Sequence, residues 1–239
     1  MGLLRMMRSP LAAVRRAWTA LDAGDAETHA TFEQESSALN LRNIKIVLPI
    51  FLFLHVLLLT VIHSAPTPTP EHVAWITSLG WIEAVFVPPT IGLLIAAHTS
   101  RSPRAGLVLG DTTATLGILA AALMSANVQR IQPNQNTFTV LALGVALVLR
   151  VRPTVYVANV LGGTAIVAYG ITHFLRDPGF VNVQIVLLAT VLALALATYA
   201  GTRILRLRDV ANRRQVEKLN ANLEERVASQ VDEITRHAK

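Results

Sequence analysis

Residues 181–239 read VNVQIVLLATVLALALATYAGTRILRLRDVANRRQVEKLNANLEERVASQVDEITRHAK. The first part, 181–201, is almost entirely apolar and has the length of about 20 residues that a helix needs to cross a bilayer core. The second part, 202–239, carries apolar residues at helical spacing among dense charges of both signs, and neither part contains proline. We therefore predict one continuous helix that leaves the membrane and enters water as a coiled coil.

The apolar positions of the second part follow a heptad-like pattern with one irregularity. They are Val216, Leu219, Leu223, Val227, Val231, Ile234 and Ala238. An extra four-residue step within this run would locally unwind a supercoil. Toward the membrane the same seam meets Asn212 and Asp209, polar residues that fix register at some cost in stability. They are candidates for a signal relay, because an imperfect coiled coil can hold two registers of similar energy. A plain dimerisation stalk or a single solvated helix fits the same pattern.

Small residues recur at every fourth position in the apolar part of this helix. They are Ala189, Ala193, Ala197 and Gly201. Residues with this spacing lie in one row along a helix and let a second membrane helix approach closely. The row fits a homodimer through this helix, and it fits equally a contact with another helix of the same chain.

The remaining chain contains five further apolar segments, so we predict an all-α membrane protein with a six-helix transmembrane bundle. These segments are 44–63, 73–97, 105–126, 134–149 and 154–175, and the fourth is the weakest. We divide the chain into an N-terminal segment, 1–41, which begins with a basic amphipathic helix, a membrane domain, 42–201, and a coiled coil, 202–239. Hydrophobic residues make up 52% of the sequence and charged residues 15%, which supports this class.

Arginines gather in alternate loops between these segments. They are Arg101, Arg104, Arg150, Arg152, Arg203, Arg206 and Arg208, whereas the opposite loop 64–72 has no Lys or Arg. The positive-inside rule therefore places both termini in the cytoplasm and the chain in the inner (plasma) membrane. The net charge of +6 favours the lipid bilayer, and not nucleic acid, as the partner of these basic ends.

Ionisable residues inside a membrane span are functional candidates by default. Glu83 and His55 lie where their helices can bring them together near mid-membrane, and Trp75 and Trp81 are close to Glu83 in the sequence. The proline pair at 88–89 is expected to break the second helix. We predict a polar cavity lined by these four side chains that binds an unknown small ligand or senses protons. The alternative is a buried pair that only orients the bundle.

A second polar group is expected nearer the Arg-rich loops. Asp111 and Asn159 enter their segments at similar depth, so we predict a hydrogen bond between them on the route from the cavity to the last helix. Close packing there would be allowed by four glycines, Gly106, Gly110, Gly162 and Gly163.

No constellation for covalent or acid–base catalysis appears in the sequence. It has no phosphate-binding glycine loop and no HExxH motif. Cysteine is absent, which excludes disulfides and thiolate-bound metals. We therefore expect no enzyme activity from these residues, no metal and no cofactor.

The segment NRRQVEKLNANLEERVASQVDEITRHAK, residues 212–239, resembles the linker helix of bacterial multi-span membrane receptors. In that family, similar LEERV-xxQV-xEI helices join a membrane domain to a class III adenylate cyclase, a histidine kinase or a serine/threonine kinase. The resemblance implies a sensor and anchor module truncated before its effector domain. It assigns no catalytic residue to this chain.

Three functions are consistent with these patterns. The first is a sensory and dimerisation module that relays a stimulus through the last helix to a cytoplasmic effector. The second is a small transporter or channel with a cytoplasmic oligomerisation helix, which is disfavoured by the few charges in the spans and the lack of an evident inverted repeat. The third is a membrane scaffold whose coiled coil recruits another protein.

Overall fold

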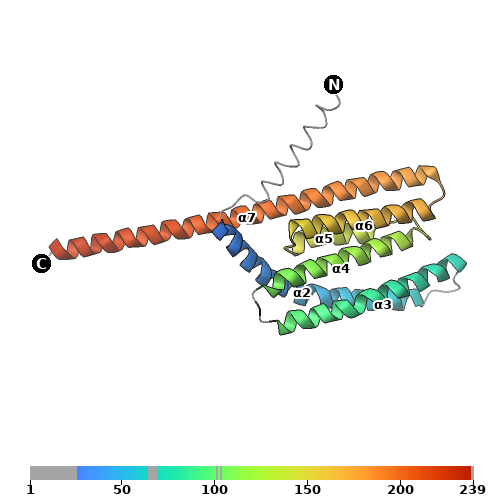
Figure 1. The fold of residues 1–239 in the computed structure, drawn as a ribbon, viewed down its shortest axis with the longest axis horizontal. Helices are drawn as coiled ribbons and strands as arrows, with labels where there is room; N and C mark the ends of the chain where they lie inside the picture. The colour runs from blue at the N-terminus through green and yellow to red at the C-terminus, as the bar shows by residue number, and fades with distance from the viewer. Residues whose placement is uncertain (1–25, 64–68, 101, 103, 238–239) are drawn as a thin grey trace, which may run out of the picture. The chain divides into compact units, whose positions relative to one another are not determined.

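The computed structural model describes residues 26–63, 69–100, 102 and 104–237. Within these residues, all regular secondary structure is α-helical. In Figure 1 these are α2 (Ala26–His63), α3 (Pro70–Thr99), α4 (Ala105–Val128), α5 (Asn136–Val148), α6 (Pro153–Phe174) and α7 (Pro178–His237). The prediction of an all-α protein is confirmed. The amphipathic helix expected in residues 1–21 lies outside the described residues, as does Ala238.

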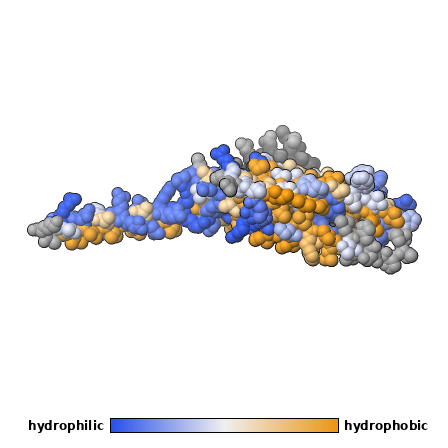
Figure 2. All heavy atoms as spheres, turned by 90° about the horizontal axis from the view of Figure 1, so that it is seen from below, coloured by the Kyte–Doolittle hydropathy of each residue, from blue (hydrophilic) through white to orange (hydrophobic). Residues whose placement is uncertain are grey.

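Five of the helices, α2, α3, α4, α6 and α7, are long and apolar enough to cross a membrane. Figure 2 accordingly shows apolar residues over much of one face of the helical bundle. The remaining helix, α5, is apolar but has only 13 residues, about 20 Å at 1.5 Å per residue, which is shorter than the ~30 Å hydrocarbon core. The chain is thus a multi-pass membrane protein, with five long apolar helices where the sequence predicted six spans.

The chain divides into two compact units. Unit 1 combines the residues up to Phe32 with those from Arg203 onward, and unit 2 comprises Glu33–Thr202. The predicted border at 41/42 falls inside α2. No glycine or proline interrupts α2 between Ala26 and Pro49, so the polar residues before the first apolar segment continue the same helix.

In unit 2, α4 packs against α3, α5 and α6. Glycines allow close contacts between the helices: a Cβ on Gly163 of α6 would come 2.5 Å from the Phe138 ring of α5 and 3.3 Å from the Ile118 side chain of α4. Gly106 and Gly110 of α4 are likewise covered, whereas a Cβ on Gly162 would meet nothing within 4 Å. Three of the four glycines are therefore closely packed, but Gly106 and Gly110 contact Ser37 and Asn40 of α2 and not the helix that carries Asn159.

A pair of stacked tyrosines attaches the membrane part of α7 to the bundle. The rings of Tyr156 (α6) and Tyr199 (α7) lie 4.2 Å apart between centroids and are nearly parallel. The Tyr156 hydroxyl donates to the carbonyl of Ala142 at 2.9 Å, and the Tyr199 hydroxyl donates to that of Val151 at 2.6 Å. Each buried hydroxyl therefore has the hydrogen-bond partner that a buried aromatic residue requires.

The expected break at Pro88 and Pro89 is wrong, since both prolines lie inside the continuous helix α3. Membrane helices tolerate proline where neighbouring helices, Ser or Thr side chains or local adjustments satisfy the freed backbone groups. Just beyond the pair, the Thr90 hydroxyl donates to the carbonyl of Phe86 at 2.7 Å.

Candidate functional site

His55 of α2 and Glu83 of α3 form a buried contact within the bundle. The Nδ1 atom of His55 lies 2.5 Å from Oε1 of Glu83, and the two residues are only 6% and 4% exposed. The Phe51 ring packs edge-on against the His55 ring, with 4.1 Å between the centroids. The contact that the sequence predicted between these two spans is therefore present.

The carboxylate of Glu83 is only half satisfied by this contact. Its second oxygen, Oε2, is buried and has no hydrogen-bond partner among the described residues. A buried polar atom without a partner destabilises the fold, and it does so more strongly when the group is charged. A contact that only orients the two helices would be expected to have all its hydrogen bonds made, and this pair does not. Oε2 of Glu83 is therefore available to a proton, a water molecule or a polar ligand atom.

The two tryptophans predicted to line a cavity with this pair differ in their surroundings. Trp75 is half-buried, and its carbonyl accepts a hydrogen bond from the Asn127 side chain at 3.1 Å. Trp81 is 71% exposed, because a residue two positions from Glu83 lies roughly 200° around the helix at 3.6 residues per turn. Its predicted place in the cavity wall is wrong.

The predicted polar cavity around His55, Trp75, Trp81 and Glu83 also has no counterpart in the cavities described for unit 2. An apolar cavity lies between α2, α3, α4 and α5, and two more polar ones lie near the α4–α5 and α6–α7 loops. None of these three has any of the four residues in its lining. Among the described residues, the site is thus a buried polar pair that lines none of these three cavities.

The hydrogen bond expected between Asp111 and Asn159 is absent, and each side chain has another partner. Asp111 accepts from the backbone N–H of Arg152 at 2.9 Å and from its guanidinium Nε. Asn159 donates to the hydroxyl of Thr115 at 2.8 Å. Arg152 is the N-cap of α6. The Asp111 carboxylate therefore stabilises the positive N-terminal end of α6 and does not bind Asn159 further along the same helix.

A polar cluster centred on Asn40, which we call the Asn40 cluster, was not predicted from the sequence. The Asn40 amide donates to the carbonyls of Gly106 and Arg150, both at 3.1 Å, and its oxygen accepts from the Arg150 N–H at 2.8 Å. The Ser37 hydroxyl accepts from the Gly106 N–H at 3.0 Å. The signal that could have revealed it is the Ser and Asn spacing at 37 and 40, which puts both side chains on one helix face.

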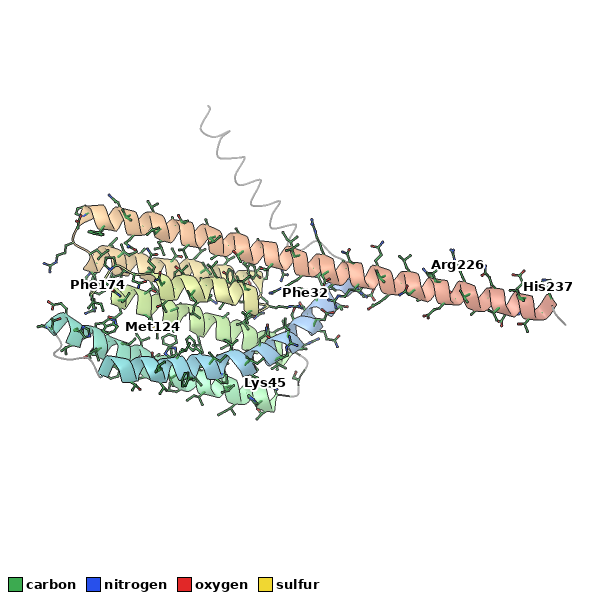
Figure 3. The ribbon with its side chains drawn as sticks, turned by 180° about the vertical axis from the view of Figure 1, so that it is seen from behind. Phe32, Lys45, Met124, Phe174, Arg226 and His237 are labelled. Atoms are coloured by element: carbon green, nitrogen blue, oxygen red, sulfur yellow. The ribbon has the colours of Figure 1, made fainter. Side chains whose placement is uncertain are left out.

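Unit 1 contains a second unpredicted contact, which we call the N-terminal clasp. Phe32 of α2 is buried with Leu207 and Val210 of α7, and Figure 3 marks Phe32 at this position. The carboxylate of Glu27 pairs with Arg214, and its other oxygen lies 3.7 Å from Nζ of Lys218. The start of α2 thus covers one face of α7 in this unit.

The two predicted relay residues of α7 are on its surface. Asp209 forms an ion pair with Arg213 at 3.2 Å, one turn along the helix, and Asn212 is exposed. The apolar row predicted to form the coiled-coil seam is also exposed, by 54–68% per residue, at Val216, Leu219, Leu223, Val227, Val231 and Ile234. Within the described chain, no helix covers this row.

The clasp and the apolar row lie on different faces of α7. At roughly 100° per residue, Leu207, Val210 and Arg214 lie about 120–180° around the axis from Val216. The clasp therefore leaves the row uncovered.

The row of small residues on the membrane part of α7 is exposed as well. Ala189, Ala193, Ala197 and Gly201 all lie on the surface of unit 2. A Cβ on Gly201 would meet nothing within 4 Å. Among the residues that the structure describes, no other helix of the chain covers this row.

No protein-family model, curated protein or solved structure matches the chain.

Proposed function

We propose that this chain is a membrane-embedded sensory and dimerisation module. A stimulus within the bundle alters the packing of its helices, and α7 relays the change through a coiled coil to a cytoplasmic effector that is not among these residues. The resemblance of residues 212–239 to receptor linker helices suggests a cyclase or a kinase as that effector. The proposal gives this chain no catalytic step of its own.

The observation that carries the proposal is the uncovered apolar row of α7. Six aliphatic side chains at heptad-like spacing stay 54–68% exposed on one face, while charged residues occupy the others. An apolar seam flanked by charges is the pattern of a coiled coil, and the clasp lies on a different face. The occupant that suits such a row is a second copy of the same helix.

The membrane part of α7 supports the same partner. Its exposed small residues, Ala189, Ala193, Ala197 and Gly201, would let two copies approach closely in lipid, where packing contacts drive helix association. A homodimer through both parts of α7 would hold two bundles side by side. A shift of α7 against its copy is then the step that reaches the effector.

In this proposal the buried pair is the sensing element. His55 and Glu83 join two membrane helices, and the unpartnered Oε2 of Glu83 gives an arriving proton or polar ligand a place to bind. Both termini are cytoplasmic and the membrane is the inner (plasma) membrane, as the Arg-rich loops suggest.

The same unpartnered oxygen favours one rival function, a small transporter or channel. Ionisable residues inside membrane spans also mark proton and ion pathways. Flux through proteoliposomes that is abolished by Glu83→Gln would support the rival and contradict the relay.

Disulfide cross-linking tests the dimer directly, because the natural chain contains no cysteine. Leu219→Cys and Leu223→Cys place a thiol in the apolar row, and Ala221→Cys places one roughly 200° away from Leu219 on the same helix turn. We expect cross-linked dimers in native membranes for the first two variants and not for the third. Equal cross-linking at all three positions, or none at any, would overturn the dimer.

The relay is tested by combining these cysteines with a change in the buried pair. Glu83→Gln in the Leu219→Cys background should alter the rate of cross-linking, because the proposal couples the bundle to α7. Trp81→Leu is the matched control, since it changes an exposed side chain on the same helix. Unchanged cross-linking in the Glu83→Gln variant would contradict a relay and leave a dimer with a structural pair.

A further inference from the structure

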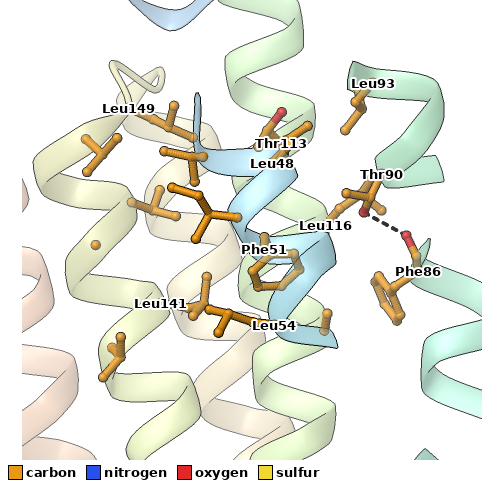
Figure 4. A pocket seen from close by; sticks show the side chains of 18 residues that line it. Leu48, Phe51, Leu54, Phe86, Thr90, Leu93, Thr113, Leu116, Leu141 and Leu149 are labelled. Atoms are coloured by element: carbon orange, nitrogen blue, oxygen red, sulfur yellow. Dashed lines mark hydrogen bonds between the residues drawn. The ribbon is translucent and has the colours of Figure 1, made fainter. Parts of the chain in front are cut away.

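An apolar cavity of about 240 Å³ lies between α2, α3, α4 and α5 of unit 2. Figure 4 shows its lining side chains, which are almost all aliphatic or aromatic. Its inner wall is formed by the buried residues Leu48, Thr90, Thr113, Ala120 and Val145 of these four helices and by Leu149, which directly follows α5. His55 and Glu83 are not in its lining, although Phe51, whose ring packs against that of His55, is.

The mouth of the cavity is also apolar. Ile50 and Leu54 of α2 and Val140 of α5 line it and are 56%, 52% and 62% exposed. These residues belong to the apolar surface that membrane helices present to hydrocarbon. A molecule that enters by this route therefore comes from the bilayer, and it must itself be apolar over most of its length.

Two glycines leave part of the space empty. Gly117 and Gly144 both line the cavity; a Cβ on Gly144 would meet nothing within 4 Å, and one on Gly117 only the Leu141 side chain at 3.6 Å. Gly163 differs, because a neighbouring ring covers it. The cavity glycines are thus not needed for contact between helices. Since protein interiors are close-packed, an unfilled space of this size suits an occupant.

One hydroxyl in the wall has no partner. Thr113 is 9% exposed, and its Oγ1 is buried without a hydrogen bond among the described residues. The other hydroxyl, on Thr90, already donates to the carbonyl of Phe86 at 2.7 Å (Figure 4). A buried hydroxyl without a partner is unfavourable, so an oxygen atom of the occupant that reaches Thr113 would be stabilised there.

We propose that this cavity binds one hydrocarbon chain from the bilayer, with a carbonyl oxygen near its end that accepts a hydrogen bond from Thr113. The volume is below the roughly 300–1,000 Å³ of pockets for drug-sized molecules, which favours a single chain over a fused-ring compound. An acyl ester of a phospholipid and the head of an isoprenoid quinone both have this chemistry. The inference does not depend on the dimer or the relay.

Photolabelling in proteoliposomes tests the site. The probe is a phosphatidylglycerol with a diazirine in one acyl chain, and labelled residues are located by mass spectrometry. Labelling of the cavity wall is measured relative to labelling of Leu161 and Tyr169, which are exposed on α6. We expect strong labelling of the wall in the natural chain. An excess of unlabelled phosphatidylglycerol or of an isoprenoid quinone then shows which of the two sources competes better.

Filling the cavity provides the decisive comparison. Gly144→Leu and Gly117→Leu should each lower relative labelling of the wall by about tenfold, as expected when a new side chain must be displaced. Gly162→Leu is the matched control, because a Cβ there also meets nothing within 4 Å but lies outside the lining. Equal relative labelling in the natural chain and these three variants, all folded by circular dichroism, would overturn the site.

Removing the hydroxyl tests the polar contact by itself. Thr113→Val keeps the shape of the side chain and should lower labelling by about threefold, the effect of an average hydrogen bond between groups in a membrane. Unchanged labelling in this variant would overturn the contact with Thr113.

Discussion

Asn40 and the His55–Glu83 pair are both buried polar groups of unit 2, but they differ in how completely their hydrogen bonds are made. The Asn40 side chain uses both its amide and its oxygen, and it contacts the first turn of α4 and the α5–α6 loop at once. The pair makes one contact between two helices, and Glu83 Oε2 has no partner among the described residues. Both sites are at most 6% exposed.

The difference separates a structural role from a candidate functional one. A satisfied polar network rigidifies the fold, because breaking it leaves several buried groups without partners. A half-satisfied group keeps a binding position open at some cost in stability, as functional sites commonly do. Substitutions at the Asn40 cluster should therefore affect mainly stability, and substitutions at the pair should affect mainly function.

The largest effect is expected for Gly106→Ala in the Asn40 cluster. The added Cβ would overlap the backbone carbonyl of Ser37, and overpacking of this kind costs typically about 1–3 kcal/mol, occasionally more. Thermal unfolding in detergent should show a lower Tm than for the control Gly92→Ala, where a Cβ meets nothing within 4 Å. Equal melting of the two variants would mean that the cluster can move apart freely.

Asn40→Leu should have the next largest effect. It leaves the carbonyls of Gly106 and Arg150 and the Arg150 N–H without their present partner, and unsatisfied buried groups cost about 1–3 kcal/mol. The same unfolding assay measures the loss. A variant as stable as the natural chain would remove the contrast between the two sites.

Glu83→Gln should change stability by less than about 1 kcal/mol, because the substituted side chain keeps its shape and a hydrogen-bonding oxygen. It should nevertheless alter cross-linking through Leu219→Cys, because the pair is the proposed sensing element. Replacement of both His55 and Glu83 by Leu sharpens the comparison, since removing both partners of a buried polar contact is often neutral for stability. A destabilisation as large as that of Asn40→Leu would assign the pair a structural role.

Trp81→Leu should have the smallest effect on stability, within about 0.5 kcal/mol, because its side chain is 71% exposed. Thermal unfolding again provides the measurement. A clear loss of stability would indicate that Trp81 has a partner on the surface of α3.

Local patterns predicted much of the architecture. Long apolar stretches without charge specify membrane helices, because a backbone in hydrocarbon must satisfy its own hydrogen bonds. The lack of proline after Gly179 and the heptad-like spacing predicted α7 as one helix, and α7 does run from Pro178 to His237. The contact between His55 and Glu83 was predictable because both residues lie at a similar depth in their spans. The 1.5 Å rise per residue of a helix converts sequence position into depth in the bilayer.

Two properties were not predictable in the same way: the direction in which a side chain points around its helix axis, and the hydrogen-bond partner that a polar side chain takes. Trp81 was placed beside Glu83 by sequence proximity, although the helical turn directs the two apart. Asp111 was paired with Asn159 because they were at similar depth, but Arg152 at the start of α6 brought a full charge and a backbone N–H to the carboxylate. A charged partner forms the stronger hydrogen bond.

By itself, the sequence determined the helical membrane class, most of the spans, the unbroken α7 and its apolar row, because all of these depend on composition and periodicity along one helix. Only the tertiary structure decided which polar groups are satisfied, which side of α7 the clasp covers, and where a cavity remains between helices. Those properties depend on how several helix faces meet, and residues distant in the sequence, such as Asn40 and Arg150, become neighbours only when the bundle has formed.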